Sequence, residues 1–293
     1  MAFEGHGVSQ IRGINISRVL KGFADEEFVF KNLVTVANTS AREIRWYKRQ
    51  TGVLDTTDAQ GMTASRLDKG AELALPEVIE QTVERQTSRV KIFSAMSPWI
   101  SNEDVADSDV PILALNVKQV PRALVKSVND HIYNTMTEDQ SAVNINTTAS
   151  TAAWDAASAV QIVKDITTGQ RKIRTNNYEP THLFLSPTDF ASVIVELVET
   201  RGSAVPQLSS ALISSGTLGT LFGLQIVVSN SVAADSACIA NPRQAVTYWQ
   251  FYPLKAVIES SEALNAQRVI CREAGLATLT DPKAVQLTTN TQT

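Results

Sequence analysis

The sequence predicts an α+β protein with a mixed sheet, and three observations carry this prediction. Residues 44–49 alternate between apolar and polar side chains, and residues 82–93 divide into two sets of side chains that would face opposite ways, the period of half-exposed strands. Residues 113–136 carry an apolar residue every three or four positions, which is typical of a long amphipathic helix. From residue 151 onward, short apolar runs such as 183–185 and 224–228 alternate with helical patterns.

Composition excludes several classes of protein. The chain has 293 residues, of which 43% are hydrophobic and 19% charged, enough for one large domain or two medium ones. Its 26 basic and 30 acidic residues give a net charge of −4, which argues against a protein that binds nucleic acid over its whole surface. No apolar stretch approaches the roughly 20 residues of a membrane span, so no membrane partner is expected. The amino terminus has no secretory pattern, which predicts an intracellular origin.

The strand at 33–49 needs a partner, and the alternating segment 82–93 predicts a long β-hairpin. Residues 51–70 between them are rich in Thr, Asp, Gly and Ser and are interpreted as a mobile tip. An isolated two-stranded ribbon is marginally stable in water, so this hairpin is expected to rest on another surface. Its basic side chains would bind acidic groups of a neighbouring subunit, with nucleic acid or a solvated strand face as alternatives. These residues are Arg42, Arg45, Lys48, Arg49, Arg85 and Arg89.

One apolar stripe predicts a single helix over residues 111–136, about 40 Å long at about 1.5 Å per residue. The stripe consists of Leu113, Val117, Val120, Leu124, Val128, Ile132 and Met136. Pro121 lies inside it, removes one backbone amide and is expected to kink the helix. Residues 141–149 then alternate again and predict a strand.

The second half of the chain reads as a compact domain. A helix is predicted over 152–169, capped by Ser150 or Thr151, and another over 187–198 after the strand 183–185. The serine-rich segment 205–218 is expected to project as a loop or short helix. Further strands are predicted at 223–228, 237–240, 255–259 and 267–279. The polar tail 280–293 is expected to fray or to return to the platform formed by the long helix and the strand at 141–149.

Catalytic and metal-binding motifs are absent from the sequence. There is no phosphate-binding glycine loop and no Gly-x-Ser-x-Gly elbow, so no cofactor is expected. The histidines, His6, His131 and His182, show no metal-ligand spacing, so no metal is expected. Ser186, four residues after His182, could act as the nucleophile of a hydrolase. Its context of Pro187 and Asp189 instead favours the cap of a helix. The two cysteines, Cys238 and Cys271, lie in strand-like apolar segments and are predicted to be buried and free.

Three stretches, in this order and separation, resemble the major capsid protein of tailed double-stranded DNA viruses, which has the Hong Kong 97-like fold. They are Ser-Pro-Trp-Ile-Ser-Asn-Glu-Asp at 97–104, Phe-Leu-Ser-Pro-Thr-Asp at 184–189 and Leu-Phe-Gly-Leu-Gln-Ile-Val-Val-Ser-Asn at 221–230. The resemblance covers nearly the whole chain and implies five regions. These are an amino-terminal arm at 1–30, an extended loop at 31–95, a peripheral domain with a spine helix at 96–150, an axial domain at 151–270, and a carboxyl-terminal strand and tail at 271–293 that return to the peripheral domain.

The resemblance implies a structural subunit, not an enzyme, that forms homo-hexamers and homo-pentamers of an icosahedral virion shell in the host cytoplasm. The shell would enclose double-stranded DNA without sequence-specific binding, with a portal protein and a separate scaffold protein as partners. A decorating or cement protein is a further candidate partner. A nanocompartment shell of the encapsulin type is the alternative within the same fold. The family's covalent crosslink has no identifiable partners here beyond the candidates Lys48 and Lys69, so noncovalent locking is expected. Axial-loop serines would meet their symmetry mates at the capsomer centre: Ser203, Ser209, Ser210, Ser214 and Ser215.

Overall fold

The computed structural model of the chain describes residues 28–49, 83–107, 112–138, 145–156, 160–197 and 219–293. The described residues form two compact units, each of which is treated by itself. The first contains the described residues up to Ile44, those of Ser88–Ile132 and those of Tyr248–Ala277. The second contains the rest. Most of the predicted arm, the predicted hairpin tip and the serine-rich segment lie outside the described residues.

A five-stranded sheet forms the frame of the first unit. Its order is β1 (Thr35–Asn38), β11 (Val246–Ser261), β12 (Ala266–Leu279) and β4 (Lys91–Met96), and β5 (Ile100–Ser101) also pairs with β12. Strands β4 and β5 both run antiparallel to β12. The strands predicted at 255–259 and 267–279 therefore exist, and the first lies in the carboxyl-terminal half of a strand of 16 residues. The short helices α2 (Phe30–Leu33) and α3 (Asn102–Asp107) complete the unit.

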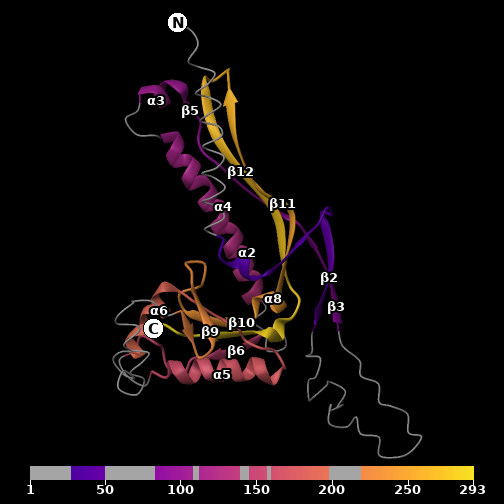
Figure 1. Ribbon diagram of the computed structural model, residues 1–293, viewed down its shortest axis with the longest axis vertical. Coiled ribbons are helices and arrows are strands. Elements are labelled where there is room, and N and C mark those ends of the chain that lie inside the picture. Colours follow the sequence, from indigo (N-terminus) through magenta and orange to yellow (C-terminus); the bar gives the residue numbers. More distant parts are fainter. Residues whose placement is uncertain (1–27, 50–82, 108–111, 139–144, 157–159, 198–218) are drawn as a thin grey trace, which may run out of the picture. The chain divides into compact units, whose positions relative to one another are not determined.

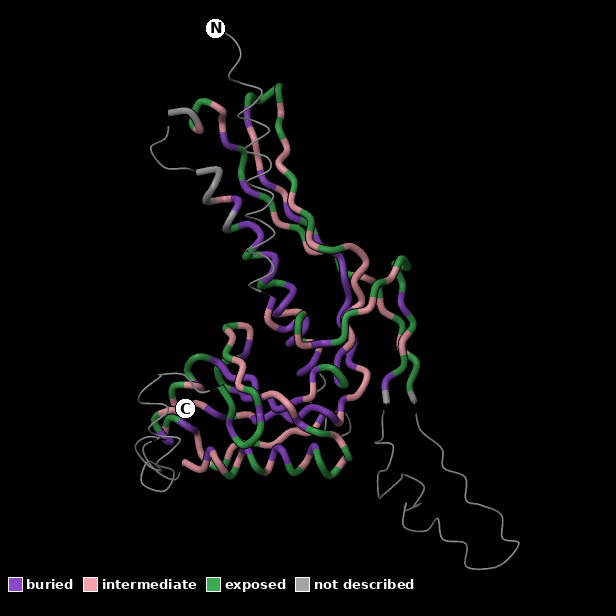
Figure 2. Tube along the Cα trace, in the orientation of Figure 1, coloured by how far each residue is buried: buried purple, intermediate pink, exposed green. Residues whose placement is uncertain are grey.

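The predicted long helix is confirmed as α4 (Ile112–Thr137), which has 26 residues. It runs alongside the long strands of the first unit (Figure 1), and buried positions alternate with exposed ones along it (Figure 2). The predicted stripe is the buried side, since Val117, Leu124 and Val128 are almost inaccessible to solvent. Pro121 is buried inside the helix.

A buried ion pair ties α2 to the sheet of the first unit. The Lys31 ammonium donates to Glu273 Oε1 over 2.6 Å, and Tyr248 Oη donates to the same oxygen over 3.1 Å. The Glu273 side chain is fully buried, so its charge depends on Lys31 for compensation. Tyr248 lies directly over Gly275, where a Cβ would come within 2.2 Å of the Tyr248 hydroxyl. Glycine is required there because of this close approach.

The predicted hairpin is confirmed in part. β2 (Glu43–Arg49) pairs with β3 (Val83–Arg89) in a two-stranded sheet, and the Val90 amide continues the pairing to the Arg42 carbonyl. The prediction was wrong at both outer ends of the hairpin. Thr35–Asn38, within the strand predicted at 33–49, form β1 and pair with β11, and residues 91–93 belong to β4, which pairs with β12. The Phe93 ring on β4 lies 5.5 Å from the ring of His131 on α4.

The second unit contains a mixed six-stranded sheet, as predicted. Its order is β6 (Asn146–Ala149), β13 (Val285–Thr289), β10 (Ser236–Ala240), β7 (His182–Leu185), β9 (Leu224–Val228) and β8 (Thr220–Leu221). The pairs β6/β13 and β7/β9 are parallel and the others antiparallel. Helix α5 (Ile162–Thr175) contacts β13, β10 and β6, and α6 (Pro187–Val195) follows β7. The short helices α8 (Pro242–Ala245) and η3 (Pro282–Ala284) complete the unit.

Two details of this unit bear on the predictions. Of the two alternatives for the tail, fraying is wrong and the return to the strand predicted at 141–149 is found, because β13 pairs with β6 on one side and β10 on the other and is mostly buried. Helix α5 starts at Ile162 rather than near residue 152. The Trp154 amide donates to the Thr291 carbonyl over 2.7 Å, and the Trp154 and Thr151 side chains donate to Asp165, so residues 150–154 follow the carboxyl-terminal segment.

Candidate subunit interface

The arginines of the hairpin are available for contacts outside the chain. Arg42, Arg45, Arg85 and Arg89 are all exposed, and none of them forms an ion pair with a carboxylate in the part of the chain that the structure describes. Four like charges on one narrow ribbon repel one another. They therefore favour a partner surface that carries negative charge.

Lys48 and Arg49 differ from these four. The Lys48 side chain is buried, and burial lowers its pKa while the nearby Glu84 carboxylate acts in the opposite direction. Along β2, Ile44 is also buried while Arg45 and Tyr47 are exposed, which is the alternation expected of a ribbon with one covered face. Lys48 lies on the covered face, so its environment is not that of the four exposed arginines. The Arg49 side chain lies outside the described residues.

A hollow of about 590 Å³ lies in the first unit where the hairpin begins and ends. We call residues 42–43 and 89–90 the hairpin root; they contribute Arg42, Glu43 and Arg89 to the lining. The sheet contributes Ile92, Phe251 and Ala274. Sequence reasoning did not find this hollow, because its lining comes from four separate segments of the chain. The only linear signal was the pair of arginines.

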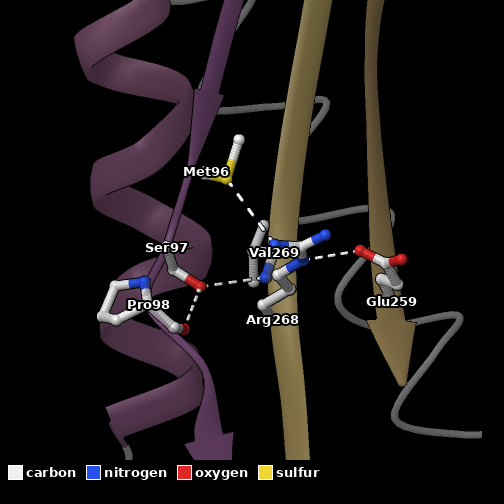
Figure 3. A network of polar contacts seen from close by, with 6 residues as sticks. All are labelled: Met96, Ser97, Pro98, Glu259, Arg268 and Val269. Atoms are coloured by element: carbon white, nitrogen blue, oxygen red, sulfur yellow. Dashed lines mark hydrogen bonds and ion pairs between the residues drawn. The ribbon is translucent and has the colours of Figure 1, made fainter. Parts of the chain in front are cut away.

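The sheet face that carries Ile92 also presents Met96 and Val257 to solvent, and all three are large apolar residues. Farther along this face, Arg268 joins three strands (Figure 3). Its Nε donates to Glu259 over 2.5 Å, one of its other nitrogens lies 3.7 Å from Met96 Sδ, and its guanidinium lies 4.3 Å from the Trp99 ring centre. These contacts hold the long strands in register.

Ser97 fixes the end of β4 in the same network (Figure 3). Its hydroxyl accepts from the Val269 amide over 2.9 Å and donates to the Pro98 carbonyl over 3.0 Å. The Ser97 amide donates in turn to the Val269 carbonyl. This reciprocal pair lets the chain leave β4 at Pro98, which has no amide hydrogen of its own to donate.

At its far end the ribbon of β11 and β12 closes in an exposed turn over residues 262–265. The Glu262 carboxylate forms no ion pair with any described residue, and Leu264 is 60% exposed, a high value for a large apolar side chain. The turn is held in place at Asn265, which has a φ of 43° and receives hydrogen bonds from the backbone and side chain of Asn102. Asparagine tolerates this left-handed conformation better than most residues.

The remaining predicted site residues are placed as follows. Ser203, Ser209, Ser210, Ser214 and Ser215 lie outside the described residues, so the axial-loop prediction stays a prediction. Pro121 lies within α4. Cys238 and Cys271 are free and buried, as predicted, and burial raises the pKa of both thiols.

Ser186 has the environment of a helix cap. Its hydroxyl accepts from the Asp189 amide over 3.1 Å and donates to the Asp189 carboxylate over 2.6 Å. The side chain is buried, and burial also lowers the pKa of His182, whose Nδ1 lies 2.7 Å from the Thr181 hydroxyl. A nucleophile enclosed in this way has no access to substrate. Within the described ranges, no three potential metal ligands gather, and no helix is long and apolar enough to span a bilayer.

Comparison with solved structures defines the fold. The chain is similar to a virus-like particle from Pyrococcus furiosus (10% identity, TM-score 0.62, 94% of this chain and 97% of that one). It is also similar to a chain from Mycobacterium phage Che8, with 15% identity and a TM-score of 0.61 over 91% of this chain and 92% of that one. The capsid of cyanophage P-SCSP1u is similar as well, with 12% identity and a TM-score of 0.64 over 91% of this chain and 89% of that one. The fold is therefore the Hong Kong 97-like fold of viral shell subunits, as predicted.

A model of the phage capsid protein family matches residues 99–288, about two thirds of the sequence. The chain belongs to this family and is a structural subunit of a virion capsid that assembles in multiple copies. The family match favours a phage capsid over a cellular nanocompartment. Among curated proteins, none matches this sequence.

Proposed function

We propose that the chain assembles into homo-hexamers and homo-pentamers that close into an icosahedral shell around double-stranded DNA. The family match over residues 99–288 carries this proposal, together with a fold similarity that extends over about nine tenths of the chain. A portal protein and a separate scaffold protein would complete assembly in the host cytoplasm, and a decorating protein could stabilise the finished shell. The chain itself would have no enzymatic activity, in agreement with the buried capping role of Ser186.

The charge of the chain suits a container for DNA. A net charge of −4 gives a wall that confines the genome without binding it tightly, and a strongly basic lining would hinder its packaging and release. Many weak contacts between subunits become one stable assembly when the shell closes. Weak single contacts also allow wrongly placed subunits to leave during assembly.

We further propose that the hairpin lies on a neighbouring subunit and binds its acidic groups through the exposed arginines. Arg45 and Arg85 support this role, because both are exposed and neither has an ion pair within the described part of the chain. DNA phosphates are the alternative partner. Noncovalent contacts of this kind would lock the shell without a crosslink.

Charge reversal separates these two partners. The variant Arg45→Glu/Arg85→Glu would be compared with Lys255→Glu, which reverses an exposed charge on β11. If the arginines bind a neighbour, electron microscopy of the double variant will show few closed shells, while Lys255→Glu assembles normally. Normal shells that contain less DNA would instead assign the arginines to the genome.

The composition of the purified particles tests the proposed function as a whole. The expected particles are closed shells that contain double-stranded DNA when the complete set of viral assembly proteins is present. A shell that contains a specific enzyme and no genome would identify a nanocompartment.

A further inference from the structure

We infer that the turn at 262–265 of one copy docks into the hollow at the hairpin root of a second copy, with Leu264 entering the apolar part and Glu262 binding Arg42 and Arg89. The inference rests on the shell assembly proposed above and names a particular pair of surfaces within it. The hollow has an exposed apolar wall beside two arginines, and the turn has an exposed leucine beside a carboxylate, so the two surfaces are complementary in charge and both leave apolar area uncovered.

The hollow needs a ligand that is both apolar and acidic. Ile92, Phe251 and Ala274 offer an apolar wall, and Ile92 is 68% exposed, so this wall gains from being covered. Arg42 and Arg89 add two exposed guanidinium groups without described ion pairs, against the single carboxylate of Glu43. The hollow therefore carries a net positive charge beside an uncovered apolar surface.

The turn offers that combination. Leu264 and Glu262 are two positions apart in a four-residue turn, and both are exposed. A leucine at the tip of a hairpin contributes nothing to the core of its own unit. The hydrogen bonds from Asn102 to Asn265 fix the turn before it binds, which lowers the entropy lost on docking.

The turn cannot reach the hollow of its own chain. Phe251 lines the hollow and Glu262 begins the turn, and both belong to the ribbon that contains β11. The eleven residue steps from Phe251 to Glu262 along this extended ribbon correspond to about 35 Å. The occupant must therefore come from another copy. Such a contact is heterologous, since the turn and the hollow are different surfaces, and contacts of this type generate rings and closed shells.

A charge swap tests the electrostatic half of the contact. In Arg42→Glu/Arg89→Glu, the hollow carries three carboxylates, counting Glu43, and these repel Glu262. In Glu262→Arg, the new guanidinium is repelled by Arg42 and Arg89 of the unchanged hollow. Each variant is expected to raise the subunit concentration needed for assembly by at least about tenfold. The combination of all three substitutions restores the opposite charges and is expected to recover most of the wild-type assembly. Glu103→Arg, which reverses an exposed charge on α3, is the matched control.

A disulfide tests the apolar half of the contact. Ile92→Cys combined with Leu264→Cys is expected to give a ladder of crosslinked chains on a nonreducing gel of oxidised particles. The control is Val36→Cys combined with Leu264→Cys, because Val36 is exposed on the same sheet and does not line the hollow. The native thiols are buried, which keeps the background low.

Three outcomes decide the inference. A ladder with position 92, none with position 36, and recovery by the charge swap would establish the contact. Normal shells of Ile92→Cys/Leu264→Cys that give no ladder after oxidation would overturn it, and so would a charge-swapped variant that assembles no better than Arg42→Glu/Arg89→Glu. Failure of the wild-type chain to form any shell with its assembly partners would refute the proposed function instead, so the two failures are distinguishable.

Discussion

His131 predicts a specific dependence of stability on pH. Its side chain lies between α4 and the sheet of the first unit, where Nε2 accepts a hydrogen bond from the Ala277 amide over 3.3 Å. The ring centre lies 5.5 Å from that of Phe93. Burial lowers the pKa of His131 from 6.5 to about 4, and the positive charge of Lys91 contributes in the same direction. The neutral ring is the form that fits, because a protonated Nε2 would face the amide hydrogen of Ala277.

The sign of the effect follows from the lowered pKa. A histidine with a lower pKa in the folded state contributes stability that is present above about pH 6.5 and is lost as the pH falls toward 4. At about 1.4 kcal/mol for each pH unit, the whole contribution is at most about 3.5 kcal/mol. Between pH 7 and pH 4.5, the free energy of unfolding should fall by about 2 kcal/mol through this one group.

Urea denaturation of the wild-type chain and of His131→Gln at both pH values isolates this contribution. Other groups titrate in both proteins, so the difference between the two pH-dependent losses reports His131 alone. The wild-type chain is expected to lose about 2 kcal/mol more than the variant. Equal losses, or an imidazole that titrates near 6.5 in the NMR spectrum of the folded chain, would refute this reasoning.

Three further substitutions test the packing. Gly275→Ala should cost about 2 kcal/mol in the free energy of unfolding, because its Cβ would collide with the Tyr248 ring, whereas Gly219→Ala, in open space, should cost far less. Lys31→Met leaves the buried Glu273 carboxylate without its cation and should cost about 3 kcal/mol, most of which Lys31→Met/Glu273→Gln should recover. Ser186→Ala should lower the melting temperature by removing about 1 kcal/mol of capping energy, and a larger loss would assign Ser186 a role beyond the cap.

Local patterns in the sequence predicted much of the fold. The stripe of α4 and the alternation in β2 depend on neighbours in the chain, so their periods were visible without a structure. The same holds for the Ser186 cap, which is set by the next three residues. For the same reason, the strands at 183–185 and 224–228 were found close to their observed bounds.

Long-range pairing explains what the sequence did not predict. The polar segment 285–289 is buried because β6 and β10 pair on either side of it, and its composition alone gave no sign of this. Helix α5 begins late because Trp154 bonds to a residue more than 130 positions away. The hollow joins residues such as Arg42, Ile92 and Phe251, which no linear motif could connect.

Cryo-electron microscopy of the assembled particle decides whether copies of this chain form a closed shell in which the hairpin and the ribbon turn of each copy contact neighbours. The expected map is icosahedral, with hexamers and pentamers and with Leu264 of one copy beside Ile92 of the next. A closed shell in which the hollow and the exposed arginines all face solvent would contradict the proposed contacts. A small oligomer that never closes would contradict the proposed function.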